Sequence, residues 1–405
     1  MHGHHTPSLG VRGSGSVLRF LRKRGTSTIS EMAAGLGYSR SKVVSRVDAL
    51  VEVGLVTTQA GTSGRRGRPA LVFDFDPHCA VLLVAQVGLS GCRLAVTDLN
   101  GVVQESFYLE VDLAEGAGRL AARIVDAFDG MLAVENGRAS LVAGIGLGMP
   151  SMIETLGYAR SLGVASLEWS LEVFRSAIEG HFGAPVYLDR DVNLLGLAER
   201  RTSWPHVETF VCVKLGTLID SAIIVNDSAV LGVNGVAGGL GHVKVRDSSE
   251  SCTCGSVGCL DAVASGSALV RQLKQRGFDV THVADVVALA NDGHPEVLQS
   301  IREAGCRIGE ALAMIVNLLN PEVVAFWGYL TAAESTLFAG IRQGLYENAL
   351  PEASAPLGLV LSSLGDTAGT KGAAMHVIDR VLDDDHIDEI LVSKSWPRSI
   401  VLAAG

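Results

Sequence analysis

The sequence predicts an α/β fold with two lobes, preceded by a small helical N-terminal domain. At 405 residues the chain is too long for one hydrophobic core. From Ala80 onward, apolar runs typical of buried strands alternate with helix-length segments, and the 47 glycines suit tight turns between them. Residues 1–70 have eleven Lys and Arg and three acidic residues, a net charge of +8, whereas the whole chain carries −10. The rest therefore carries −18, and this contrast indicates an N-terminal domain that meets a polyanion.

The N-terminal domain has the periodicity of three helices. Short breaks that contain Gly and Ser separate them, and Ser30 and Ser39 are placed to cap the second and third helix. After Gly54, two β-type runs flank a tip rich in Gly and Arg, as in a hairpin wing. The sequence predicts a winged helix-turn-helix domain over residues 14–76, with helices over 17–24, 29–36 and 39–53.

The third predicted helix has the features of a DNA recognition helix. Its apolar face consists of Val43, Val47, Leu50 and Val51. Polar side chains are then expected to be exposed near its start, where a recognition helix presents donors to the major groove. These residues are Arg40, Ser41, Lys42, Ser45 and Arg46.

The wing tip carries three further cations, Arg65, Arg66 and Arg68, which are placed to enter a minor groove. An ordinary three-helix surface domain with a solvated Arg cluster is the alternative. Helix order, wing and charge together favour binding to double-stranded DNA. Since one such domain makes few base contacts, we expect a homodimer or homotetramer that reads a pseudo-palindromic operator.

A cluster of one His and three Cys lies in the second half of the chain. His242, Cys252, Cys254 and Cys259 fall within eighteen residues on a Gly-rich stretch. Four such donors satisfy tetrahedral Zn²⁺ and leave no open position, so we expect a structural zinc site. The alternative is three unrelated buried thiols and a surface His.

The other cysteines, Cys79, Cys92, Cys212 and Cys306, are scattered in apolar sequence and are expected to be reduced core thiols. No run approaches the length of apolar sequence that a membrane helix needs, and no leader with a cleavage site is evident. We therefore expect a cytoplasmic protein without a membrane partner.

The body alternates strand-like and helix-like segments in two groups. We expect a first lobe over residues 78–195 and a second over 196–385, with the terminal segment returning to the first lobe. Gly-rich turns from the two lobes are expected to face each other across a cleft.

These segments resemble the ROK family, named for repressors, open reading frames and sugar kinases. The resemblance rests on the His and Cys spacing, the VNGVAGGLGH approach to it, the GCLDAVASG segment after it, NPEVV, and LGDTAGTKGAA near the end. It covers about residues 78–385 and implies an actin-like ATPase fold of two lobes. Family members that act as transcriptional regulators carry a winged helix in front, and kinase members lack it.

The phosphate loops that the resemblance implies have changed. In kinase members an acidic residue ends the first strand, where this chain has Gln86, and Leu89 stands in place of a Gly. A second glycine loop reads Gly216-Thr217-Leu218-Ile219-Asp220 here. Phosphoryl transfer depends on positioning and charge neutralisation, and the loss of one stabilising donor typically costs about 10²- to 10³-fold in rate. We therefore expect no kinase activity and no catalytic residue.

The sugar side of the implied cleft is better preserved. Asp191 aligns with the family's general base, His242 with a zinc ligand whose ring lies against the sugar, and Asp261 with a sugar-binding Glu. Against these, Arg190 replaces an Asn, and Gly239 replaces a Glu. The predicted effector residues are thus Asp191, His242, Asp261 and Arg190.

Three alternatives remain for the effector: a sugar, a phosphorylated or acidic sugar that uses Arg190, or no small molecule at all. Asp191 could instead simply cap the helix that follows it. The function we expect is a zinc-containing transcriptional regulator of the repressor type whose body senses a sugar or sugar-derived metabolite. The alternatives are an ATP-dependent sugar kinase with an accessory DNA-binding domain, and a constitutive DNA-binding protein with a vestigial cleft.

Overall fold

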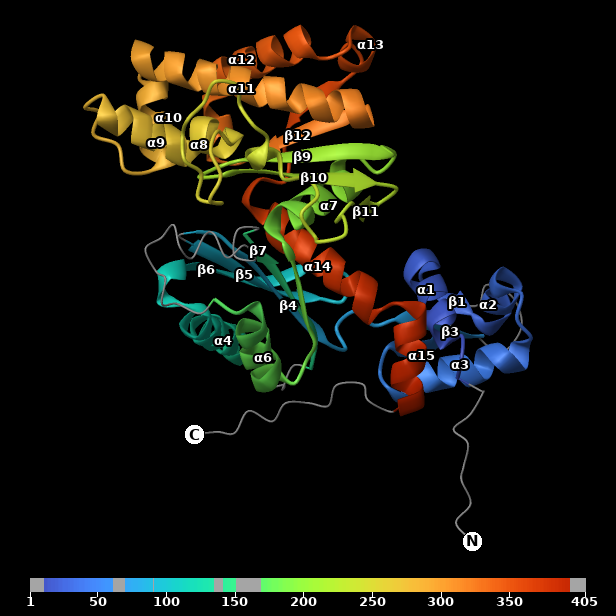
Figure 1. Ribbon diagram of the computed structural model, residues 1–405. Helices are drawn as coiled ribbons and strands as arrows, with labels where there is room; N and C mark the ends of the chain where they lie inside the picture. The colour runs from blue at the N-terminus through green and yellow to red at the C-terminus, as the bar shows by residue number, and fades with distance from the viewer. Residues whose placement is uncertain (1–10, 61–69, 90, 135–140, 151–168, 394–405) are drawn as a thin grey trace.

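The computed structural model describes residues 11–60, 70–89, 91–134, 141–150 and 169–393. In these residues the chain forms a small N-terminal domain and two lobes, each built on a five-stranded sheet. Figure 1 shows the lobes one above the other, with the N-terminal domain beside the first lobe. This agrees with the α/β class that the sequence predicts.

The N-terminal domain is a three-helix unit with a β-hairpin. Its elements are α1 (Ser14–Arg24), β1 (Ser27–Thr28), α2 (Ile29–Leu36), α3 (Arg40–Glu52), β2 (Val56–Ala60) and β3 (Leu71–Phe75). The strands form an antiparallel sheet in the order β1-β3-β2. The predicted helices and wing strands are confirmed, and the wing tip lies outside the described residues.

One of the two predicted caps is correct. Ser39 caps α3, because its hydroxyl accepts a hydrogen bond from the Lys42 amide. The Ser30 cap is wrong: Thr28 caps α2, and its side chain and Glu31 form a reciprocal capping box. Thr28, not Ser30, stands three residues before a Glu, which is the spacing that this box requires.

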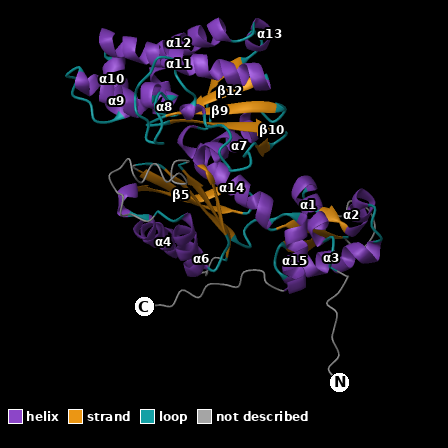
Figure 2. Ribbon diagram, in the orientation of Figure 1, coloured by secondary structure: helices purple, strands orange, loops and turns teal. Residues whose placement is uncertain are grey.

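The first lobe has a mixed sheet in the order β6-β5-β4-β7-β8. β4, β5 and β6 are antiparallel neighbours, whereas β4, β7 and β8 run parallel. Helices α4 and α6 cover one face of this sheet (Figures 1 and 2). The elements are β4 (Val81–Val87), β5 (Gly91–Asp98), β6 (Val103–Glu110), η1 (Leu113–Glu115), α4 (Ala117–Val134), β7 (Val142–Met149), α6 (Leu171–Phe182) and β8 (Val186–Arg190).

The second lobe repeats this strand pattern, with the order β11-β10-β9-β12-β13. A large core lies between its sheet and its helices. The strands are β9 (Thr209–Leu215), β10 (Ile219–Val225), β11 (Ser228–Ala229), β12 (Val323–Trp327) and β13 (Gly358–Leu361). The helices are α7 (Asp191–Ser203), η3 (Leu240–His242), α8 (Leu260–Ala264), α9 (Gly266–Gln275), α10 (Val283–Asn291), α11 (Pro295–Leu319), η4 (Tyr329–Ala333), α12 (Glu334–Asn348) and α13 (Pro351–Ser354).

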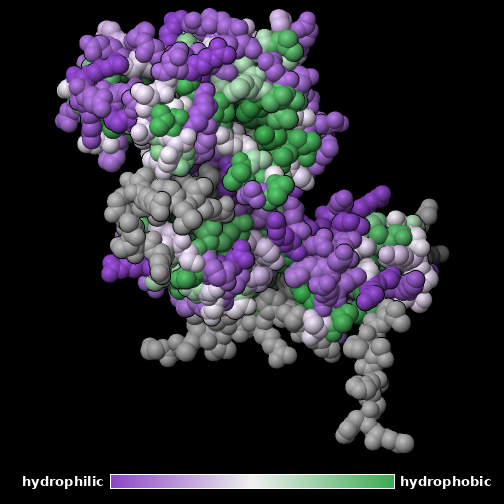
Figure 3. Space-filling view, in the orientation of Figure 1, coloured by the Kyte–Doolittle hydropathy of each residue, from purple (hydrophilic) through white to green (hydrophobic). Residues whose placement is uncertain are grey.

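The surface of this lobe is unevenly polar. Figure 3 shows hydrophilic residues over α11 and α12, and an apolar area on the side of β9 and β10. Among the described helices, none combines the length and apolar character that a bilayer span requires.

The last part of the chain links all three units. After η5 (Gly365–Thr367), α14 (Ala368–Val381) packs against α7 and the first-lobe sheet, and α15 (Asp384–Ser393) packs against α1 (Figure 1). The backbones of α7 and α14 approach closely, since a Cβ on Gly372 would lie 2.0 Å from the Leu194 carbonyl oxygen. One continuous apolar core joins the N-terminal domain, β4 and β5, α14 and α15. The N-terminal domain is therefore packed onto the body.

Candidate effector cleft, metal site and DNA-binding surface

The N-terminal end of α3 presents polar side chains to solvent. Arg40, Ser41, Lys42 and Ser45 are exposed. Arg40 donates a hydrogen bond to the Ser30 hydroxyl on α2 at 2.6 Å, which ties the first turn of α3 to the preceding helix. These four predicted DNA contacts lie on one accessible surface, whereas Arg65, Arg66 and Arg68 lie outside the described residues.

The predicted exposure of Arg46 is wrong. Arg46 is only 7% exposed, because it lies on the α3 face that also buries Val43 and Val47. Its Nε donates to the Arg12 carbonyl oxygen at 2.7 Å, and its guanidinium lies 4.2 Å from the Tyr38 ring centroid. Arg46 therefore fastens the segment before α1 and does not present its charge to DNA.

The predicted burial of Val51 is wrong as well. Predicted as part of the apolar face of α3, this residue is 36% exposed, while Leu50 is fully buried. The buried face is thus centred one position earlier than predicted, and Arg46 takes part in it.

The four predicted metal ligands come together. The donor atoms of His242, Cys252, Cys254 and Cys259 all lie within 4.8 Å of one another. The His242 Nδ1 lies 3.8 Å from the Cys252 Sγ, and the Cys254 Sγ lies 3.7 Å from the Cys259 Sγ. This arrangement fits one tetrahedral ion with thiolate and imidazole ligands.

Local turns and a nearby cation support the cluster. The Gly255 amide donates to the Cys252 carbonyl, and Gly255 has φ +86°, a conformation that glycine adopts without strain. The Lys244 ammonium lies 3.2 Å from the Cys259 Sγ. The site can thus hold a divalent metal, with all protein ligands from one short stretch.

Two of the four predicted effector residues have other partners. The Arg190 guanidinium forms a buried ion pair with Asp220 at 2.5 Å and donates to the Ala237 carbonyl. The Asp261 carboxylate is buried and accepts the Ile219 amide at 2.7 Å. Burial raises the pKa of Asp261 to about 6. Arg190, at the end of β8, thus joins the first lobe to the second and has its charge balanced, whereas Asp261 bonds within the second lobe.

Asp191 lies in the cleft between the lobes. It is the first residue of α7, and its carboxylate pairs with the Lys214 ammonium on β9. Burial raises the pKa of Asp191, an effect that the neighbouring Lys214 charge opposes. A carboxylate that accepts a lysine can still accept hydrogen bonds from ligand hydroxyls, but it is not a free base.

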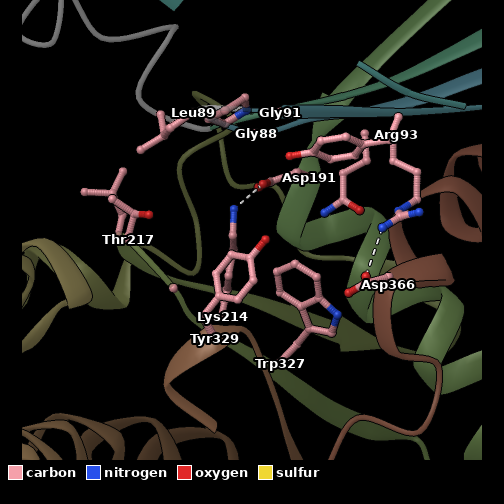
Figure 4. Close-up of a pocket in the computed structure, with 15 residues that line it drawn as sticks. Gly88, Leu89, Gly91, Arg93, Asp191, Lys214, Thr217, Trp327, Tyr329 and Asp366 are labelled. Atoms are coloured by element: carbon pink, nitrogen blue, oxygen red, sulfur yellow. Dashed lines mark hydrogen bonds and ion pairs between the residues drawn. The ribbon is translucent and has the colours of Figure 1, made fainter. Parts of the chain in front are cut away.

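The cleft has an empty volume of about 830 Å³, part of it open to solvent. In Figure 4, Gly88, Leu89 and Gly91 of the first lobe face Lys214 and Thr217 of the second. The remaining lining residues are Gln86, Arg93, Tyr108, Pro150, Asp191, Gly216, Leu218, Trp327, Tyr329 and Asp366. Of the four predicted effector residues, all within the described chain, Asp191 alone lines it.

Sequence reasoning missed most of the polar and aromatic lining: Lys214, Arg93, Asp366, Tyr108, Trp327 and Tyr329. Lys214 carries a signal, since it is a lone cation inside the apolar run VCVKLG. Trp327 and Tyr329 flank the glycine that directly follows β12. Arg93, Tyr108 and Asp366 reach the cleft from distant segments and carry no local signal.

These features define a class of protein. Two lobes with matching five-stranded sheets enclose a cleft with a buried carboxylate, and a winged helix-turn-helix domain precedes them. The chain belongs to the ROK family, whose family model matches residues 85–380. Residues 14–60 match the IclR helix-turn-helix domain.

Both a sugar kinase and a repressor are among the proteins similar to this chain. It is 27% identical to a glucokinase of Halalkalibacterium halodurans over 71% of this chain and 91% of that protein. It is 22% identical to a putative xylose repressor of Caldicellulosiruptor sp. over 90% of this chain and 95% of that protein. The glucokinase alignment leaves room for little beyond the two lobes, whereas the repressor alignment takes in the N-terminal domain as well.

A solved structure supports the fold. A ROK family transcriptional regulator, described as a homologue of the Escherichia coli MLC protein, matches with a TM-score of 0.76 at 22% identity. The match covers 95% of this chain and 99% of that one. The arrangement of an N-terminal domain on two lobes therefore recurs in a solved structure.

Proposed function

We propose that this protein is a DNA-binding transcriptional regulator of the repressor type whose DNA binding responds to a sugar held in the cleft between the lobes. The observation that supports the proposal is that α3 exposes polar side chains at its start, while Asp191, Gln86 and Leu218 line the cleft between the lobes. The xylose repressor similarity, which extends over both parts, supports it.

The DNA-binding part of the proposal rests on α3. Arg40, Ser41, Lys42 and Ser45 form its exposed N-terminal surface, and the paired wing strands β2 and β3 follow the helix in the chain. Since one α3 reaches few base pairs, we propose that a homodimer or homotetramer binds two half-sites of a pseudo-palindromic operator. Arg65, Arg66 and Arg68 on the wing tip remain proposed minor-groove contacts.

A structural Zn²⁺ is part of the proposal. His242, Cys252, Cys254 and Cys259 would hold it, which leaves no open position for substrate. The ion would fix the loop between η3 and α8, and with it the wall of the second lobe that carries Asp261.

Loss of kinase activity is also proposed. The side chains of Gln86, Leu89 and Leu218 line the cleft where polyphosphate would need glycine backbone and a metal-binding carboxylate. Lys214, a cation that could neutralise phosphate, is already paired with Asp191. The glucokinase similarity keeps a sugar kinase as the second candidate.

The test has two arms. An operator is selected from random duplex DNA, and its affinity is measured by fluorescence anisotropy with and without D-xylose and D-glucose. We expect a salt-dependent affinity that one of the sugars changes, and that Arg40→Ala with Lys42→Ala strongly weakens. Failure to select any DNA would contradict the proposal.

The second arm is a coupled assay with ATP, Mg²⁺ and the same sugars. We expect no turnover. Turnover of about 1 s⁻¹ or more, the low end for kinases, would establish the second candidate instead.

A further inference from the structure

One exposed side chain near the start of α3 is apolar. Val44 is 41% exposed, whereas its neighbours Val43 and Val47 are fully buried. Among the described residues, the apolar core of the N-terminal domain does not include Val44, even as a partly buried member. Valine is also a weak helix former, because its branched side chain loses rotamer freedom in a helix. Neither core packing nor helix propensity therefore accounts for a valine at this position.

Polar side chains surround Val44 on the surface of α3. These neighbours are all exposed: Arg40 and Ser41 in the preceding turn, Ser45, and Asp48 in the following turn. A single exposed apolar residue is ordinary on a protein surface, so the position of Val44 matters more than its exposure. A second protein chain would favour a contiguous apolar patch, which these neighbours do not provide. A partner that matches this surface presents one small apolar group among hydrogen-bonding groups.

The contacts of two cations show on which side of α3 Val44 lies. Arg40 donates to the Ser30 hydroxyl at 2.6 Å, so the first turns of α2 and α3 form one surface. The Lys42 ammonium lies on another side of the helix, 6.0 Å from the Tyr38 ring centroid. Val44 is one turn after Arg40 and two residues after Lys42, which places it on the Arg40 side. Val44 is thus part of the surface that α2 and α3 share.

The major groove of B-DNA offers a group that fits this surface. The groove admits an α-helix, and every base pair presents hydrogen-bonding groups there. Thymine alone among the four bases adds a C5-methyl group, which apolar side chains contact. Against any other base edge, Val44 would cover a donor or acceptor without bonding to it, which is costly. The chemistry of Val44 therefore favours thymine.

We propose that Val44 packs on the C5-methyl group of a thymine in each operator half-site and so specifies an A·T pair at one position. Ser41 and Ser45 lie beside it and would bond to neighbouring base edges, since a hydroxyl both donates and accepts. Contacts to phosphate position the protein but do not read sequence. Val44 thus determines part of the operator sequence, and the inference rests on the proposed binding of DNA by α3.

The test uses the full chain and an operator selected from random duplex DNA. Each thymidine of one half-site is replaced in turn by deoxyuridine, which pairs in the same way and lacks only the methyl group. We expect one of these replacements to raise the Kd about fourfold, the effect of one buried methyl group. In Val44→Ala the same replacement should change the Kd by less than about twofold, because the methyl group has lost its partner.

Two variants on the same helix are matched controls. Val44→Thr keeps a branched side chain with one methyl group, and it should retain the preference for thymine over uracil. Val51→Ala shortens an exposed valine about two turns further along α3. It should leave the fourfold effect of the replacement unchanged. The Tm of all three variants should match that of the wild type, since the changes lie at exposed positions.

Three results would overturn the inference while the proposed function stands. One is an operator in which no thymine shows coupling to Val44. Another is an equal loss of affinity in Val44→Ala for the thymine and the uracil operator. The third is weaker self-association of Val44→Ala without DNA, which would place Val44 between two copies of the chain. Failure to select any operator would contradict the proposed function itself.

Discussion

Single residues decide how the DNA-binding domain and the cleft work, and Arg46 illustrates this best. Arg46 lies on α3 and was predicted to contact DNA. Its guanidinium instead donates to the Arg12 carbonyl oxygen and lies over the Tyr38 ring. A charged donor bonded to backbone in a buried position holds structure together, and its loss leaves the acceptor unpaired.

Replacement of Arg46 by alanine should destabilise the DNA-binding domain by about 2 kcal/mol, from the lost charge-assisted hydrogen bond and ring contact. Hydrogen exchange of amides in α1 and α3 measures this. Lys42→Ala is the control on the same helix, since Lys42 is exposed and should change stability by less than about 0.5 kcal/mol. Equal exchange rates in both variants would show that Arg46 has no anchoring role.

The metal cluster gives the second prediction at this scale. The purified protein should hold about one zinc ion per chain, and Cys254→Ser should lose most of it because a hydroxyl is a poorer zinc ligand. Structural zinc contributes on the order of 10 kcal/mol of apparent binding energy, so the Tm should also fall markedly. Elemental analysis and calorimetry measure the two effects.

Cys306→Ser on α11 is the matched control for this variant. Cys306 lies outside the cluster, where its thiol contacts only the Gln343 amide oxygen at 3.7 Å among the bonds resolved for it. Its replacement should leave zinc content unchanged. A wild-type protein that contains no zinc after purification without chelator would contradict the assignment.

At the scale of elements, α15 holds α1 in place. The Asp388 carboxylate accepts the backbone amides of Gly13 and Gly15 at 2.5 and 2.9 Å. Gly13, the N-cap of α1, has no side chain that could accept hydrogen bonds from the first amides of the helix. Asp384 accepts the Ser16 hydroxyl and pairs with Arg19 at 3.0 Å. The C-terminal helix thus supplies the cap that α1 lacks.

Asp388→Ala should therefore destabilise α1 by about 1 kcal/mol, the usual loss for an N-cap, and loosen its contact with α15. Faster amide exchange in α1 together with weaker operator binding is the expected result. Glu389→Ala, one residue further on the same helix and exposed, serves as the control. If exchange in α1 is the same in both variants, the cap has no energetic role.

Local patterns predicted elements well and long-range contacts poorly. The bounds of α2 and the Ser39 cap follow from periodicity and hydroxyl placement, which act within a few residues. Arg46 was predicted to be exposed, although its spacing from Val43, Val47 and Leu50 is that of the buried face, and its partners Arg12 and Tyr38 could not be known from the sequence. The pairing of Lys214 with Asp191, and of Arg93 with Asp366, joins segments far apart in the chain and depends on the fold.

At the scale of the whole molecule, the cleft and the DNA-binding domain are joined by packing. The continuous core through β4, β5, α14 and α15 leaves no loose linker among the described residues between the cleft and α1. Asp366 of η5 lines the cleft directly before α14. A ligand in the cleft can therefore shift the N-terminal domain, provided that it binds one arrangement of the domains better than the other.

The most direct test of this account is thermodynamic linkage between sugar and operator. The Kd of the sugar that changes operator affinity is measured on the free protein and on the operator-bound protein, and operator affinity is measured with and without this sugar. We predict that both ratios agree and are about tenfold, a coupling of about 1.4 kcal/mol. A sugar that binds equally well to the free and the operator-bound protein would contradict the account.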